Sequence, residues 1–71
     1  RKLDIAVVYI DRVLKRDPEM PAALMLRGSI RLAQSRYAEA ASDLMSVARR
    51  ADAPRRAVTN CGLALIQAGD E

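Results

Sequence analysis

Residues 21–54 read PAALMLRGSIRLAQSRYAEAASDLMSVARRADAP, and this stretch decides the fold. Apolar residues recur in it at intervals of three and four, which is the spacing of one face of an α-helix. The pattern predicts a helix over about residues 21–34, with Pro21 suited to its first position, and a second helix for which Ser35 is the expected N-cap. The apolar face of that second helix comprises Tyr37, Ala40, Ala41, Leu44, Val47 or Ala48, and Ala51.

The flanking segments carry the same helical pattern. Before the central stretch, a helix is predicted over about residues 2–16, and it should end at Asp17 because Pro18 disfavours the helical conformation of the residue before it. After the central stretch, a helix is predicted from about residue 55 to residue 68, ending at Gly69. No alternating strand pattern is present, so we expect an all-α fold of about four helices. The apolar stripe of the first helix is Leu3, Ala6, Val7, Ile10, Val13 and Leu14.

The sequence also repeats with a period of 34. At this offset Gly28 falls on Gly62 and Ala6 falls on Ala40. A glycine inside a helix costs about 1 kcal/mol relative to alanine, so we interpret both glycines as points where two helices approach closely. The other matches are Leu3 with Tyr37, Ile10 with Leu44, Val13 with Val47, Lys15 with Arg49, Arg16 with Arg50, Leu24 with Val58, Leu32 with Ile66 and Ser35 with Gly69.

On these residues the chain resembles the tetratricopeptide repeat, a 34-residue helix-turn-helix unit with helices called A and B. The resemblance implies antiparallel helix-turn-helix repeats over residues 1–71 as a single module. Residues 1–20 then correspond to helix B and the linker of a preceding repeat, residues 21–54 to one complete repeat, and residues 55–71 to helix A of a following repeat. Since Arg1 leads directly into a helical pattern, we expect the chain to be a segment of a longer array.

Two arginines depart from the family pattern. Arg27 and Arg31 stand where such repeats usually carry large apolar residues in helix A. An arginine just before the glycine is a familiar variant of these repeats and is often accompanied by an aspartate in helix B, where this chain has Asp43. We therefore predict a contact between Arg27 and Asp43. The neighbouring units carry Cys61 and Tyr9 at the corresponding positions.

Composition argues against catalysis. The 71 residues include no His and a single Cys, Cys61, so the sequence offers no pair of groups for nucleophilic catalysis, no proton shuttle and no metal-ligand set. We expect a non-enzymatic protein without cofactor or metal, in which Cys61 is a buried, inert thiol. No run of 18 apolar residues predicts a membrane span, and the net charge of +3 is spread over the sequence.

The resemblance instead implies a scaffold for protein–protein interaction, in which ligands lie along a concave face formed by the A helices. A groove floored by Met25, Leu32, Leu63 and Ile66 favours an apolar peptide or an amphipathic helix. The candidate groove residues are Ala22, Met25, Ser29, Leu32, Ala33, Arg56, Thr59, Asn60, Leu63, Ile66 and Gln67.

Three other functions remain open. The first is a module that serves only array or self-assembly contacts. Ile5, Val8 and Tyr9 make the first helix apolar almost all round, which predicts that both of its sides are covered by further repeats or by another copy. A basic nucleic-acid-binding domain is a weaker alternative. It rests on the cations around Pro54, which are Arg49, Arg50, Arg55 and Arg56. A secretion-type chaperone is the third. The sequence names neither partner nor compartment; its Ala and Arg content favours a bacterial source, and the cytoplasm is the default location.

Overall fold

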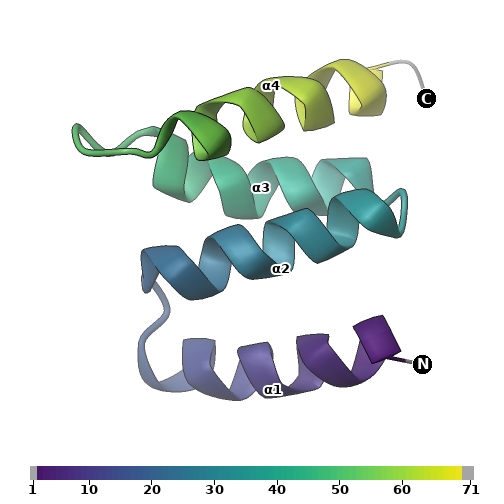
Figure 1. Ribbon diagram of the computed structural model, residues 1–71, viewed down its shortest axis with the longest axis vertical. Coiled ribbons are helices and arrows are strands. Elements are labelled where there is room, and N and C mark those ends of the chain that lie inside the picture. The colour runs from purple at the N-terminus through teal and green to yellow at the C-terminus, as the bar shows by residue number, and fades with distance from the viewer. Residues whose placement is uncertain (1, 70–71) are drawn as a thin grey trace.

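The computed structural model describes residues 2–69, and within this range the chain forms four α-helices and no strand (Figure 1). Successive helices run antiparallel and stack in the order of the sequence. Helices α2 and α3 pack extensively on one another, as do α3 and α4, while α1 packs on α2 alone. The all-α prediction is confirmed. The helices are α1 (Lys2–Arg16), α2 (Pro21–Ala33), α3 (Tyr37–Ala48) and α4 (Arg55–Gly69).

The turn between α2 and α3 differs from the prediction at Ser35. The N-cap of α3 is Arg36, and no side chain caps the helix, so the assignment of Ser35 as N-cap was wrong. Ser35 has a φ of 60° and is the left-handed residue that ends α2. Its N–H donates to Leu32 O at 3.0 Å, and the Arg36 N–H donates to Arg31 O at 2.8 Å. These two bonds form a Schellman motif, so the short turn uses Ser35 to satisfy the carbonyls of α2 rather than the amides of α3.

The third helix is shorter than predicted. It ends at Ala48, with Arg49 as its C-cap, so Ala51 lies exposed in the following turn and does not belong to the apolar face of α3. The Ala53 N–H donates to Arg50 O at 3.1 Å, which closes a turn directly before Pro54. Pro54 disfavours the helical conformation of Ala53, so α3 cannot continue through this turn into α4.

One of the two mid-helix glycines lies at a close helix contact. A Cβ atom on Gly28 would lie 2.6 Å from Leu44 Cγ and 2.8 Å from Leu44 Cδ2, and Leu44 is fully buried. The close approach of α2 and α3 at Gly28 is therefore confirmed. A Cβ atom on Gly62 would meet no atom within 4 Å, so the close contact predicted at Gly62 is wrong for the described residues. No helix in that range covers this side of α4.

The core lies between the helices in two clusters. One joins α1, α2, α3 and α4 through Ile10, Leu14, Ala23, Leu24, Ile30, Val47 and Ala57. The other is built from small residues where α3 meets α4, namely Ala40, Ala41 and Ala64, with Leu32 packed against it. Small side chains at this contact allow the two helices to approach closely.

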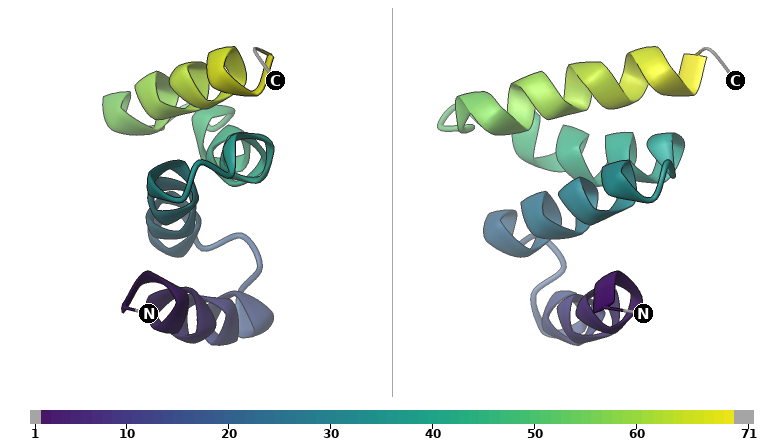
Figure 2. Two further views of the ribbon diagram at one scale, coloured as in Figure 1. Left: turned by 90° about the vertical axis from the view of Figure 1, so that its right-hand side faces the viewer. Right: turned by 45° about the vertical axis from the view of Figure 1, so that its right-hand side comes forward.

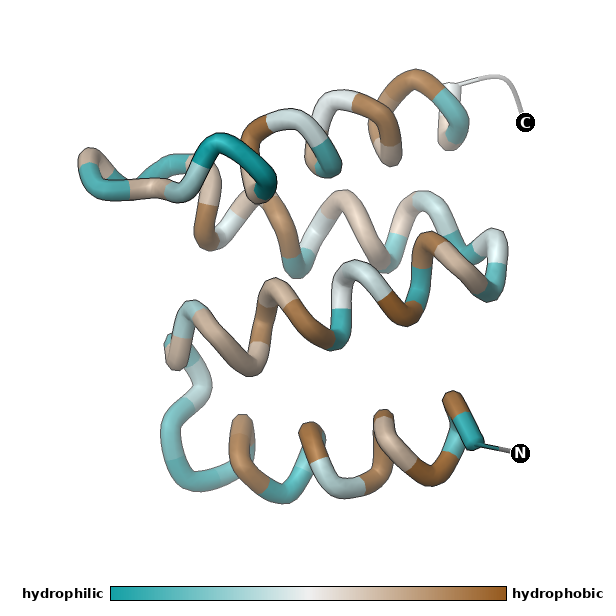
Figure 3. Tube along the Cα trace, viewed as in Figure 1, coloured by the Kyte–Doolittle hydropathy of each residue, from teal (hydrophilic) through white to brown (hydrophobic). Residues whose placement is uncertain are grey.

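Part of the predicted stripe of α1 lies outside the core. Leu3 and Val13 are 43% and 41% exposed, because α1 contacts only one other helix and the edge of its stripe faces solvent. Figures 1 and 2 show α1 and α4 at opposite ends of the stack, and Figure 3 shows hydrophobic residues along both. Among residues 2–69, no helix is both long enough and apolar enough to span a membrane.

Candidate functional site

A network of charged side chains links α1, α2 and α3. Arg27 on α2 makes a bidentate contact with Asp43 on α3, with Nε donating to Oδ2 at 2.9 Å and Nη2 donating to Oδ1 at 2.7 Å. The remaining Nη1 of Arg27 donates to Asp11 Oδ1 on α1 at 2.8 Å. The predicted contact between Arg27 and Asp43 is confirmed. The network extends beyond it to a third helix.

Arg31 belongs to the same network. Its Nη1 donates to Asp43 Oδ2 at 2.9 Å, and its Nε lies 3.5 Å from Glu39 Oε2. Asp43 thus receives three N–H donors while only 4% of the residue is exposed. The hydrogen bonding of Arg27 to Asp43 is the largest influence that raises the pKa of Arg27, and the bond to Asp11 adds to it against the opposing effect of burial. The guanidinium therefore stays charged, and the two arginines that depart from the family pattern have a packing explanation.

Sequence reasoning missed Arg31, Asp11 and Glu39 as members of this network. For Arg31 a signal was available, because it follows Arg27 by four residues and so lies on the same face of α2. For Asp11 there was no local signal, since it sits on a different helix. The network consists of paired groups that fix the helices relative to one another, and it borders no described cavity.

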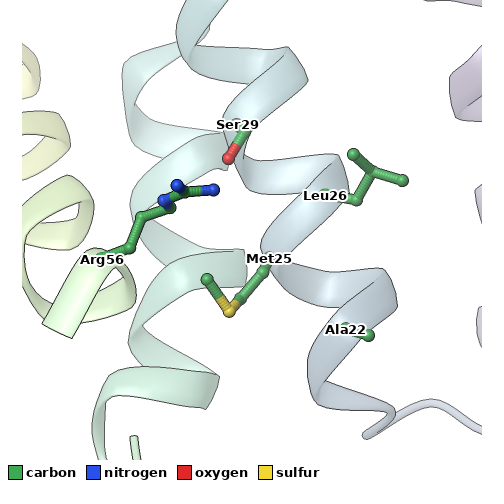
Figure 4. A pocket seen from close by; sticks show the side chains of 5 residues that line it. All are labelled: Ala22, Met25, Leu26, Ser29 and Arg56. Carbon is green, nitrogen blue, oxygen red and sulfur yellow. The ribbon is translucent and has the colours of Figure 1, made fainter. Parts of the chain in front are cut away.

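The hollow most relevant to binding lies beside α2, at the N-terminal end of α4 (Figure 4). Its volume is about 310 Å³. Met25 points from α2 into the space toward Arg56 of α4, with Ser29 one turn along, whereas Leu26 points away from Arg56. The lining residues are Ala22, Met25, Leu26, Ser29 and Arg56.

The hollow contains four of the eleven predicted groove residues. Leu26 was missed, although its neighbour Met25 was named; it is 53% exposed and extends the apolar wall along α2. The remaining predicted residues do not line this hollow. Leu32 is half-buried against the alanine cluster of α3 and α4, Asn60 is half-buried, and the others are exposed, namely Ala33, Thr59, Leu63, Ile66 and Gln67.

Arg56 gives the hollow a positive charge. Its side chain is exposed and forms no ion pair within the part of the chain that the structure describes. Met25 packs partly against the core, and its flexible thioether can adjust to different apolar ligands. Nearby, Arg50 Nε lies 3.6 Å from Asp52 Oδ1, so this ion pair neutralises part of the positive charge around Pro54. The arrangement suits an apolar group next to an acidic one.

A second hollow, of about 480 Å³, lies on α1 and is lined by Arg12, Val13, Lys15 and Arg16. The Arg12 guanidinium stands 5.7 Å from the centre of the Tyr9 ring, a cation–π distance. Cys61 is buried, with its Sγ 4.0 Å from Ala41 O. Residues 2–69 contain no group of three acidic, His or Cys side chains placed to hold a metal ion.

Antiparallel helices stacked in sequence order, with a 34-residue period, define an α-helical repeat protein. Residues 1–56 match the family model described as tetratricopeptide repeat, and the chain belongs to that family. Such repeats are generally non-catalytic and mediate protein–protein interaction. No curated protein and no solved structure matches the chain.

Proposed function

We propose that this chain is a protein-interaction scaffold that binds an apolar peptide segment, or the apolar face of a helix, in the hollow beside α2. One observation carries the proposal, which is that the apolar residues Ala22, Met25 and Leu26 line the hollow together with the exposed Arg56. A volume of about 310 Å³ holds a few side chains rather than a folded domain. The ligand is therefore a short linear segment or one face of a helix.

The chemistry of the lining defines the ligand further. An apolar side chain of the ligand would pack on Met25, and a carboxylate of the ligand would accept hydrogen bonds from the Arg56 guanidinium. The Ser29 hydroxyl can donate to a backbone carbonyl of the same ligand. We expect a motif with a large apolar residue and an Asp, a Glu or a free carboxyl terminus close to it.

The repeat organisation is part of the same proposal. Residues 1–20 act as helix B of one repeat and its linker, residues 21–54 as a complete repeat, and residues 55–71 as helix A of the next. The offset of 34 that aligns the two glycines supports this frame. In it α2 and α4 are both A helices, which explains why one hollow takes residues from both.

The test is selection of peptides from a random library displayed on phage, with the 71-residue chain immobilised. We expect enrichment of sequences that combine a large apolar residue with an acidic one. The variant Arg56→Glu should lose these peptides or select basic ones in their place, because the charge at the hollow is reversed. Fluorescence anisotropy on one selected peptide would give the change in Kd, which we expect to be at least roughly tenfold.

Arg55→Glu is the matched control, since Arg55 is the preceding residue, is also exposed, and does not line the hollow. It changes the net charge by the same amount. The proposal fails if the library yields no enriched motif, or if the two variants weaken binding equally. Equal weakening would mean that the overall charge attracts the peptide and the hollow does not recognise it.

A further inference from the structure

The end helices α1 and α4 both carry apolar residues that nothing in residues 2–69 covers. On α1, Tyr9 is 62% exposed, and on α4, Val58 and Leu65 are 51% and 48% exposed. The two helices lie at opposite ends of the stack (Figure 1). We propose that these faces bind one another between copies, so that α4 of one copy packs against α1 of the next and the chain associates head to tail.

The internal repeat supplies the geometry of this contact. At the offset of 34, α4 corresponds to α2, and α1 corresponds to α3. Helices α2 and α3 pack extensively against each other within one copy. The contact between α2 and α3 is therefore a template for a contact between α4 and the α1 of another copy.

The glycines fit this template. Within one copy, Gly28 leaves the space that the Leu44 side chain fills. The counterparts at the offset are Gly62 and Ile10, and a Cβ atom on Gly62 would meet nothing within 4 Å. A glycine inside a helix costs stability relative to alanine, and that cost has no compensation within one copy. Ile10 packs in the core of its own copy but keeps 7% of its surface exposed, whereas Leu44 keeps none. This remaining edge of Ile10 would lie against Gly62 of a second copy.

The charged residues of the α2–α3 contact have uncharged counterparts in α4 and α1. In the contact of α2 with α3, Arg27 and Arg31 face Asp43. Their counterparts are Leu65 and Tyr9, which are exposed on the open faces of α4 and α1, and Cys61, which is buried against α3. Had only one face lost its charges, an unpaired charge would be buried on association, at a large cost. At the exposed counterpart positions, Leu65 and Tyr9, both faces are uncharged, so at these points they are complementary to each other.

The exposure of Val13 also fits a contact that is missing within one copy. Val13, which is partly exposed on α1, corresponds to the fully buried Val47 on α3, and the second hollow lies directly at Val13. One feature opposes the contact. By the template, Lys15 and Arg16 of one copy approach Arg55 and Arg56 of the other. Salt screens such repulsion, so association should strengthen with ionic strength.

The contact joins two different faces, so each copy can bind a further one, and the product is an open chain or a closed ring. Sedimentation velocity on the 71-residue chain at rising concentration tests this. We expect the average mass to increase with concentration and with added salt. A chain that stays monomeric up to roughly 1 mM, where even a weak contact of about 4 kcal/mol would be populated, overturns the proposal.

Two single variants test the head-to-tail arrangement. Leu65→Glu blocks the α4 face and Tyr9→Glu blocks the α1 face, and each variant alone should be monomeric. An equimolar mixture should form a one-to-one dimer, because the intact α4 of one variant meets the intact α1 of the other. Met45→Glu, a change at an exposed apolar residue of α3 that belongs to neither surface, should associate like the original chain. If one face variant assembles normally, or if the mixture stays monomeric, the proposal is wrong.

The variant Gly62→Ala separates loss of association from loss of folding. The added methyl group meets nothing within one copy, so far-ultraviolet circular dichroism should show an equally helical chain. Between copies it would collide with Ile10, and the association should weaken by roughly tenfold or more. Unchanged association in Gly62→Ala contradicts the template. Since Tyr9, Leu65 and Gly62 do not line the peptide hollow, failure here leaves the proposed function standing.

Discussion

Asp43 is the centre of the charge network, and we predict that Asp43→Ala lowers the free energy of unfolding by about 3 kcal/mol. Asp43 accepts hydrogen bonds at 2.9 and 2.7 Å from Arg27 and at 2.9 Å from Arg31. Removing one partner from a buried ion pair costs about 3–5 kcal/mol, because the other charge is left without compensation. The lower end applies here, since the Arg27 and Arg31 side chains are 21% and 19% exposed and water can reach them in part.

Urea unfolding followed by far-ultraviolet circular dichroism measures this loss. A domain of 71 residues typically has a free energy of unfolding of about 4–11 kcal/mol, so the variant should still fold, with a much lower midpoint. Asp11→Ala is the matched control. Asp11 also bonds Arg27, at 2.8 Å, but its side chain is 50% exposed, and its loss should cost less than about 1 kcal/mol.

Equal losses in Asp43→Ala and Asp11→Ala would refute the reasoning, because burial would then not determine the strength of these pairs. A loss below about 1 kcal/mol for Asp43→Ala would refute it as well, since it would mean that water replaces the carboxylate at little cost. The combined variant Arg27→Met, Arg31→Leu and Asp43→Leu removes all three charges together. It should recover most of the stability, since well-packed apolar residues often replace a buried ion network without loss.

Three further substitutions should change the free energy of unfolding, one lowering it and two raising it. Each is measured by the same urea titration at a concentration where the chain is monomeric. Gly28→Ala should destabilise the chain by about 1–2 kcal/mol, because collision with the buried Leu44 outweighs the gain in helix propensity. Gly62→Ala should stabilise the monomer by about 0.5–1 kcal/mol, since the methyl group meets no neighbour; destabilisation would show a contact that the structure lacks. Ser35→Gly should stabilise by up to about 1 kcal/mol, because φ is 60° there, and a loss would mean that the Ser35 side chain contributes more than the backbone strain costs.

Much of the fold was predictable because helices are encoded locally. The spacing of apolar residues located all four helices, and prolines placed two of the three breaks, those before α2 and before α4. Capping was less predictable. Ser35 is a good N-cap residue by type, yet the short turn required a left-handed residue at that point to end α2. The choice between these two roles depends on the path of the chain and not on the residue.

The candidate site was predicted only in part. The face of α2 was identified, so Ala22, Met25 and Ser29 were found, together with Arg56 on α4. Leu26 was missed, although it follows Ala22 by four residues and precedes Ser29 by three, a spacing that places it on the same face of α2 as the residues that were named. The other predicted residues lie farther along the helices or against the core, as Leu32 does. Which of them bind a ligand stays a prediction.

By itself the sequence determined the helices, their 34-residue period, membership in the tetratricopeptide repeat family and the pairing of Arg27 with Asp43. These follow from short-range periodicity and from a repeat that places the same residue types at the same points. Only the tertiary structure decided that Asp11 joins the network, that Gly28 is packed while Gly62 is open, and that Leu3 and Val13 are partly exposed. Burial depends on which helix lies on the other side, and no property of a single helix contains that information.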